Sequence, residues 1–217
     1  MIPTNYELEF EPLFNNFTFN GIEIITVNLQ RSADLIILDA AELKIKNCHV
    51  IQGTKIITAK PSLNEKNEKL TIKLAKKIKG KAKLCIEFTG ILNDRLLGFY
   101  KSQYKDKRGK TKYLATTQFE AADARRAFPC WDEPAVKATF DISLLVDKHL
   151  DAISNMPIIS KKTVDSKILY KFGRTPIMST YLLYLGVGEF EYLHGKLRNI
   201  KIRIVTTKGN KNKGKLS

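Results

Sequence analysis

The chain has 217 residues and a mass of 24.7 kDa, about the size of one large domain. Hydrophobic residues make up 43% and charged residues 27%, a composition that excludes an intrinsically disordered chain. The net charge of +15 is concentrated in three lysine-rich stretches with few aromatic side chains, residues 75–83, 101–112 and 194–217, which favours solvated faces over a nucleic-acid-binding surface.

Short runs rich in β-branched residues recur along the whole chain. In the last of them, Ile200, Ile202 and Ile204 alternate with Lys201 and Arg203, as in a half-buried strand. The runs predict strands at residues 22–29, 35–38, 55–59, 70–74, 84–88, 139–146, 168–172, 181–184 and 198–205. Glycine-containing pairs between the runs predict turns at Asn20-Gly21, Gln52-Gly53, Lys79-Gly80, Arg108-Gly109 and His194-Gly195.

Helical spacing is almost absent. The one helix-compatible stretch, residues 121–127, is about two turns long and ends at Phe128-Pro129. The sequence therefore predicts an all-β fold with mostly antiparallel strands and at most one or two short helical turns.

Targeting and cysteine patterns favour a cytoplasmic protein. No apolar run reaches the 18 residues that a membrane helix needs, and the first residues do not resemble a secretory signal. Cys48, Cys85 and Cys130 are odd in number and widely spaced, so we expect reduced thiols.

The chain lacks the usual metal and nucleophile motifs. The histidines, His49, His149 and His194, are far apart, and neither His-Glu-x-x-His nor Cys-x-x-Cys occurs. A Gly-x-Ser-x-Gly motif is also missing. We therefore expect this chain by itself to bind no zinc and to carry no catalytic residue.

Residues 116–134 combine acidic, basic and aromatic side chains and two prolines. Gln118 and Glu120 are two positions apart at the expected end of a strand, so both should point to one face, where they could bind a ligand ammonium group. The alternative is a pair of solvated polar residues. A salt-bridge cluster that holds a turn is also predicted, from Asp123, Arg125, Arg126, Asp132 and Glu133.

Five motifs in the same order resemble the N-terminal domain of the aminopeptidase N family of zinc metallopeptidases. Residues 116–134 resemble the hallmark of that domain, and the other matching segments extend over the rest of the chain. They are Gly98-Phe99-Tyr100-Lys101-Ser102, Ser154-Asn155-Met156-Pro157, residues 175–183 followed by Gly188-Glu189-Phe190-Glu191, and Thr206-Thr207-Lys208-Gly209, in which Lys208 replaces the usual proline.

The resemblance implies a saddle-like domain of two packed or curled sheets over residues 1–207, with residues 208–217 as a basic tail or the start of a linker. It also implies that Gln118 and Glu120 bind the free α-amine of a peptide substrate. In the family this domain leans against a catalytic domain that holds the zinc. We therefore expect a catalytic domain or separate catalytic chain and a peptide as partners, and neither a membrane nor a nucleic acid.

The family's zinc-binding His-Glu-x-x-His, its Gly-x-Met-Glu-Asn strand and its catalytic tyrosine are absent from these 217 residues. We therefore expect either a truncated protein or a split gene whose second product carries the catalytic half. A binding or adaptor module derived from the family, without peptidase function, is the alternative, and a basic nucleic-acid module is a third hypothesis. If a catalytic domain is missing, apolar or aromatic side chains between Gln118 and Trp131 should be unusually exposed. Phe119, Phe128 and Trp131 are the candidates, and the alternative for each is a place in the core.

Overall fold

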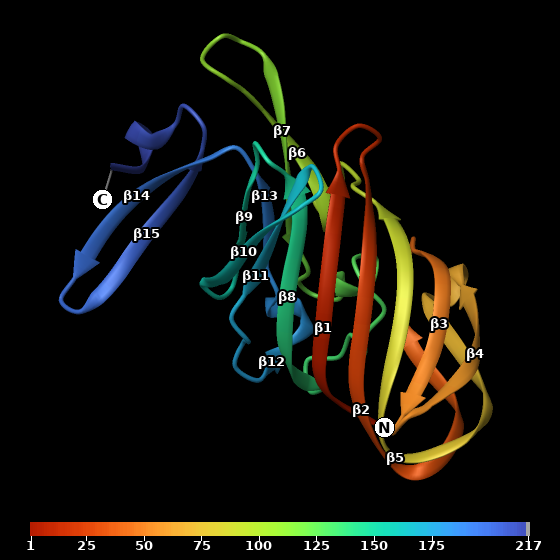
Figure 1. The fold of residues 1–217 in the computed structure, drawn as a ribbon. Helices are drawn as coiled ribbons and strands as arrows, with labels where there is room; N and C mark the ends of the chain where they lie inside the picture. Colours follow the sequence, from red (N-terminus) through yellow and green to blue (C-terminus); the bar gives the residue numbers. More distant parts are fainter. Residues whose placement is uncertain (216–217) are drawn as a thin grey trace.

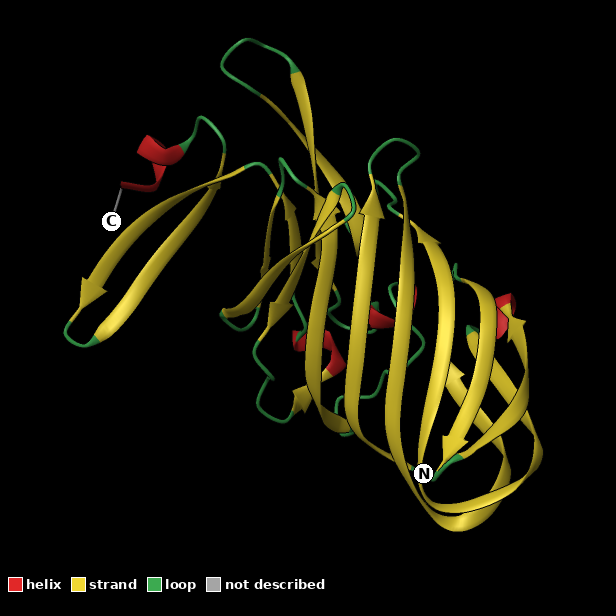
Figure 2. Ribbon diagram, in the orientation of Figure 1, coloured by secondary structure: helices red, strands yellow, loops and turns green. Residues whose placement is uncertain are grey.

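The structure, a computed structural model, describes residues 1–215 as an all-β protein of three sheets (Figures 1 and 2). The all-β prediction is confirmed. Residues 216 and 217, the end of the predicted tail, lie outside the described residues. The largest sheet has nine strands: β1 (Ile2–Leu13), β2 (Thr18–Asp39), β3 (Lys44–Gln52), β4 (Lys55–Asn64), β5 (Lys69–Ile91), β8 (Lys137–Asp147), β10 (Ile158–Val164), β11 (Lys167–Phe172) and β12 (Met178–Ser179).

The nine-stranded sheet runs in the order β10-β11-β8-β1-β2-β5-β3-β4, with β12 beside β8. Its pairs are antiparallel except β1 with β8, which are parallel. Strands β2 and β5 pair along almost their whole length, and β4 pairs with both β3 and β5. The β4 end of the sheet therefore closes on itself around a core of aliphatic side chains.

The second sheet has four strands in the order β6-β7-β13-β9, formed by β6 (Gly98–Lys105), β7 (Thr111–Gln118), β13 (Leu185–Gly188) and β9 (Asp151–Ser154). It packs on the large sheet through aromatic rings. Phe99 of β6 lies 5.8 Å from Phe10 of β1 and 5.3 Å from Phe19 of β2, measured between ring centroids. Because all three rings are fully buried, this contact orients β7 and the residues that follow it.

Several predicted boundaries are wrong. Residues 181–184 do not form a strand, because Thr180–Leu182 forms a 3₁₀ turn instead. The predicted turn at Asn20-Gly21 lies inside β2, where a Cβ on Gly21 would be 2.3 Å from the Phe88 ring. Here glycine permits close packing and does not mark a turn. The predicted turns at Lys79-Gly80 and His194-Gly195 also lie within strands.

Helical structure is confined to single 3₁₀ turns in the described residues. They span Glu65–Asn67, Ala124–Arg126, Thr180–Leu182 and Lys211–Lys215. The second falls in the stretch predicted to be helix-compatible, before Phe128-Pro129. No helix in residues 1–215 has the length and apolar character needed to cross a membrane.

The third sheet is a hairpin of β14 (Phe190–Leu197) and β15 (Ile200–Thr207), which projects from the body in Figure 1. The chain then turns back, so that Gly214 lies against Leu193 and Ile204 of this hairpin. The three cysteines are free; Cys48 and Cys130 are buried, and Cys85 is half-buried.

Candidate functional site

Of the two residues predicted to bind an amine, Gln118 is the last residue of β7 and Glu120 follows it by two positions, at the start of a turn. Gln118 and Glu120 are exposed, whereas Phe119 between them is 1% exposed. Alternation along the extended chain therefore places Gln118 and Glu120 on the outer side and Phe119 in the core. The backbone N–H of Glu120 donates a hydrogen bond to Oε1 of Gln118 at 3.2 Å, which holds the two residues together.

Glu120 takes part in none of the ion pairs found within residues 1–215, so its carboxylate is available to a ligand. Tyr100 and Thr116, which pair across β6 and β7, lie on the same face as Gln118. The hydroxyls of Thr116 and Tyr184 are 3.2 Å apart. Together these side chains form an open polar wall on the four-stranded sheet.

The turn after Glu120 is fixed by Arg125. Its Nε donates to Oδ2 of Asp132 at 3.0 Å, and its Nη1 donates to Oε2 of Glu68 at 3.2 Å and lies 3.6 Å from Oδ1 of Asp39. Burial lowers the pKa of Arg125, but the hydrogen bond to Asp132 and the charge of Asp39 give a net upward shift. The guanidinium therefore stays charged and ties the turn to the end of β2.

Arg126 makes a second set of contacts. It donates to Asp123 at 2.8 Å, to Glu68 at 2.8 Å and to Glu42 at 2.6 Å. A Cβ on Gly98, which pairs with Gln118, would be 2.8 Å from Cβ of Arg126, and Gly98 has φ = +65°. Only glycine fits this position easily, so the turn packs directly behind the polar wall.

Asp132 connects the turn to a distant part of the chain. Its carboxylate is buried and accepts a hydrogen bond from Oγ1 of Thr180 at 2.9 Å, while its backbone N–H donates to Asp39 at 3.1 Å. The predicted cluster of Asp123, Arg125, Arg126 and Asp132 is therefore present. We define it, with the three acids that the sequence did not predict, as the arginine cluster: Asp39, Glu42, Glu68, Asp123, Arg125, Arg126 and Asp132.

Two parts of the sequence prediction are wrong here. Glu133 is exposed and takes no part in the ion pairs of the arginine cluster. Phe119 and Phe128 are not exposed, because their rings pack against each other at 6.1 Å and Phe128 also contacts Tyr6. Only Trp131 is partly exposed. Phe119 and Phe128 therefore belong to the domain's own core and give no evidence of a missing partner.

A metal site is not formed by the part of the chain described. Within residues 1–215, no three His, Cys, Asp or Glu side chains are grouped so that they could hold a metal ion. The described residues near Gln118 and Glu120 therefore do not fit a zinc site.

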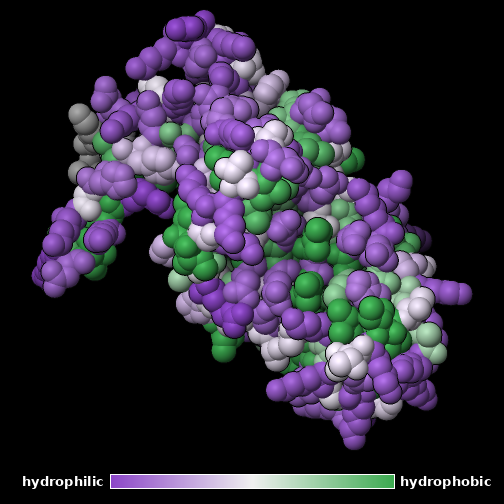
Figure 3. All heavy atoms as spheres, in the orientation of Figure 1, coloured by the Kyte–Doolittle hydropathy of each residue, from purple (hydrophilic) through white to green (hydrophobic). Residues whose placement is uncertain are grey.

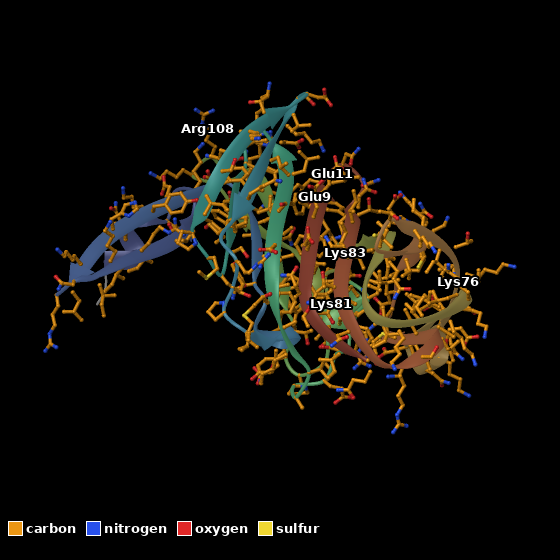
Figure 4. The ribbon with its side chains drawn as sticks, turned by 60° about the horizontal axis from the view of Figure 1, so that its bottom comes forward. Glu9, Glu11, Lys76, Lys81, Lys83 and Arg108 are labelled. Atoms are coloured by element: carbon orange, nitrogen blue, oxygen red, sulfur yellow. The ribbon has the colours of Figure 1, made fainter. Side chains whose placement is uncertain are left out.

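The three basic stretches lie on different parts of the molecule. Figure 4 shows Lys76, Lys81 and Lys83 along β5 and also labels Arg108, which lies between β6 and β7. The third stretch, which starts at His194, includes most of the β14–β15 hairpin. On the large sheet, Lys83 also pairs with Glu7 of β1 at 3.3 Å. This distribution fits the interpretation of solvated strand faces.

Residues 2–182 match the family described as the peptidase M1 N-terminal domain. Over 99% of its length the chain is 41% identical to puromycin-sensitive aminopeptidase of Caenorhabditis elegans, of which it covers 23%. It is 38% identical over its whole length to the mitochondrial aminopeptidase 2 of Saccharomyces cerevisiae, covering 23% of that protein, and to aminopeptidase M1 of Arabidopsis thaliana, covering 25%.

These comparisons confirm the resemblance drawn from the five sequence motifs. The chain spans about a quarter of the length of the curated relatives it matches. The family match ends at residue 182, before the β14–β15 hairpin, whereas the whole-length relatives align with the hairpin as well. The chain belongs to the peptidase M1 N-terminal domain family.

Proposed function

We propose that this chain is the N-terminal part of a cytoplasmic zinc aminopeptidase and that Gln118 and Glu120 bind the free α-amine of the peptide. The observation that carries the proposal is the exposed carboxylate of Glu120, which forms no ion pair within residues 1–215. It lies beside the amide of Gln118, next to the turn that the arginine cluster holds. The amide oxygen and the carboxylate accept hydrogen bonds, and the carboxylate supplies the charge that an ammonium group needs.

Such a site would explain a preference for peptide ends. An internal segment of a peptide has no ammonium group, so binding it here would desolvate Glu120 without giving it a partner. In this chain the wall is open to water, which weakens a charge pair. A second wall, from the polypeptide that completes the enzyme, would exclude that water and strengthen the interaction.

Zinc would be held by that second polypeptide, since residues 1–215 provide no grouped ligands for it. Bound zinc activates water and polarises a peptide carbonyl in this class of hydrolase. The contribution of Gln118 and Glu120 is to place the amino end of the substrate, and no proton transfer is assigned to them. We further propose that the β domain ends near residue 207 and that a basic linker follows.

Activity measurements with and without the rest of the enzyme test this proposal. The chain alone should contain no stoichiometric zinc after washing and should not hydrolyse an amino-acid anilide above background. A chimera in which this chain replaces the aligned segment of the C. elegans relative should hydrolyse it. Stoichiometric zinc in the isolated chain would contradict the proposal, and a folded, zinc-loaded but inactive chimera would instead support the adaptor alternative.

A further inference from the structure

The loop between β6 and β7 borders a cavity of about 410 Å³ that two other segments complete. These segments are the residues at the start of β14 and those directly after β15. In Figure 3, which has the orientation of Figure 1, hydrophilic residues cover the upper end of the molecule, where this loop lies. Four cationic side chains line the cavity: Lys107, Arg108, Lys112 and Lys208.

Contacts between the three segments hold the cavity together. The backbone N–H of Lys208 donates a hydrogen bond to the carbonyl oxygen of Glu189 at 3.0 Å. Gly209 has φ = +92°, and a Cβ at this position would be 3.2 Å from Cγ of Lys107. Glycine therefore allows the chain after β15 to pass close to the β6–β7 loop.

Glu189 holds two of the four cations. It pairs with Lys112, and its Oε2 lies 3.4 Å from Nζ of Lys208. The hydrogen bond from Lys112 lowers the pKa of Glu189, so the carboxylate stays ionised and shares one negative charge between two ammonium groups. Glu191, which also lines the cavity, accepts a hydrogen bond from the backbone N–H of Lys211 at 3.1 Å.

The β6–β7 loop supplies the other two cations. Lys107 and Arg108 are exposed and take part in no ion pair within residues 1–215. Asp106, the acid beside them, accepts hydrogen bonds at 2.9 Å from the backbone N–H groups of Arg108 and Lys110. These bonds fix the loop, and they leave the side chains of Lys107 and Arg108 available to bind an anion.

Tyr104 lines the cavity from the end of β6, where it pairs with Lys112 of β7. Its hydroxyl oxygen is shielded from solvent and has no hydrogen-bond partner within residues 1–215. Burial raises the pKa of Tyr104, and the charge of Glu189 raises it further, so the hydroxyl keeps its proton and remains a donor. A buried hydroxyl without a partner costs free energy, which a ligand oxygen beside it would recover.

We propose that this cavity binds the phosphate group of a small molecule. A phosphate group carries up to two negative charges and three acceptor oxygens, which suits several cations better than a carboxylate with one charge and two oxygens. The guanidinium of Arg108 can donate two parallel hydrogen bonds to it, while the lysines add charge. A rotation of the Lys112 side chain from Glu189 toward the ligand would let the Tyr104 hydroxyl donate to the same phosphate.

Titration calorimetry of the whole 217-residue chain with pyrophosphate, at constant ionic strength, tests the proposal. The site variant combines Lys107→Gln and Arg108→Gln. The matched control combines Arg31→Gln and Lys76→Gln, which remove the same charge from exposed residues of β2 and β5. Pyrophosphate should bind with a stoichiometry of one. The site variant should weaken this binding on the order of a hundredfold, and the control should leave it nearly unchanged.

Tyr104→Phe separates the hydroxyl from the charges. Because the ring is kept and the hydroxyl has no partner to lose within residues 1–215, the unfolding midpoint of the ligand-free chain should stay unchanged or rise. The affinity for pyrophosphate should nevertheless fall roughly tenfold. Tighter binding of pyrophosphate than of inorganic phosphate would indicate a diphosphate ligand, and the reverse order a single phosphate group.

Equal weakening by the site variant and the control would overturn the proposal, because binding would then reflect only the net charge of the chain. Absence of saturable binding at millimolar pyrophosphate would also overturn it, as would tighter binding of acetate than of inorganic phosphate. Lys112 lies near the start of β7 and Glu120 follows its end, and these readouts use no peptide. The proposal therefore stands apart from the binding of a peptide amine.

Discussion

Replacing Arg125 with alanine should lower the free energy of unfolding by about 3–5 kcal/mol, the cost of breaking a buried charge network by removing one partner. Asp132 is 4% exposed and Asp39 is also 4% exposed, and Arg125 contacts both carboxylates. Without the guanidinium, the buried Asp132 carboxylate loses its ion pair and keeps the hydroxyl of Thr180 as a partner, while Asp39 keeps its ion pair with Lys69. For a protein of this size the loss corresponds to a fall in melting temperature on the order of 10 °C.

Chemical and thermal unfolding of Arg125→Ala and Arg174→Ala provide the comparison. Arg174 pairs with Asp141 at 2.6 Å, but its side chain is 61% exposed, so its removal should leave the melting temperature nearly unchanged. Equal stability of the two variants would show that the arginine cluster does not hold the turn after Glu120.

Replacing Glu23 with leucine should stabilise the protein, and the gain should grow with pH. Glu23 is fully buried in β2, where it pairs with Leu8 and Ile86, and neither of its carboxyl oxygens has a hydrogen-bond partner among residues 1–215. Burying a polar group without a partner costs about 1–3 kcal/mol, which leucine avoids. Desolvation by burial raises the pKa of Glu23 well above its ordinary value.

The sign of the pH effect follows from proton counts. Between its unfolded and folded pKa values, Glu23 binds more protons in the folded state, so the wild-type stability falls as pH rises through this window. The advantage of Glu23→Leu should therefore increase by up to about 1.4 kcal/mol per pH unit until the folded pKa is reached. Below the ordinary carboxyl pKa the two stability curves should run parallel. Urea unfolding at several pH values measures both, and a pH-independent difference would contradict the prediction.

Strands could be predicted from the sequence where hydrophobic and polar residues alternate over several consecutive positions. The alternation at Ile200, Ile202 and Ile204 predicted β15, and residues 139–146 predicted most of β8. Strand β1 was missed, although Tyr6, Leu8 and Phe10 alternate with acids and all three are buried. Residues 69–91 form one strand, β5, although the sequence predicted two separate strands at residues 70–74 and 84–88. The lysines between them lie on the solvent-facing side of β5 and do not mark a loop.

Short apolar runs were ambiguous. Residues 181–184 have strand-like composition, but periodicity over four residues cannot distinguish a strand from a turn. The hydrogen bond from Thr180 to Asp132, 48 residues away in sequence, accompanies the turn that forms there. Such long-range contacts are not visible in local patterns.

The candidate site was predictable only in part. The spacing of Gln118 and Glu120 predicted that both side chains lie on one face. By the same alternation, the side chain of Phe119 between them should point into the core, as it does. The acids Asp39, Glu42 and Glu68 could not be assigned to Arg125 and Arg126, since they come from other elements brought close by the fold. Glu23 could have been recognised as buried, because it continues the inward positions of Phe19, Ile25 and Val27.

The ratio of kcat/KM for a free-amine peptide to that for its N-acetylated analogue, measured for Glu120→Gln in the chimera, tests the amine-binding account most directly. A charged hydrogen bond to the ammonium contributes about 1.5–3 kcal/mol, so the ratio should fall roughly ten- to a hundredfold. Gln118→Ala should reduce it less, because a neutral hydrogen bond is weaker and water can replace it. Both side chains are exposed, so the melting temperature should barely change. An unchanged ratio for Glu120→Gln in an active chimera would contradict the assignment of Glu120 to the substrate amine.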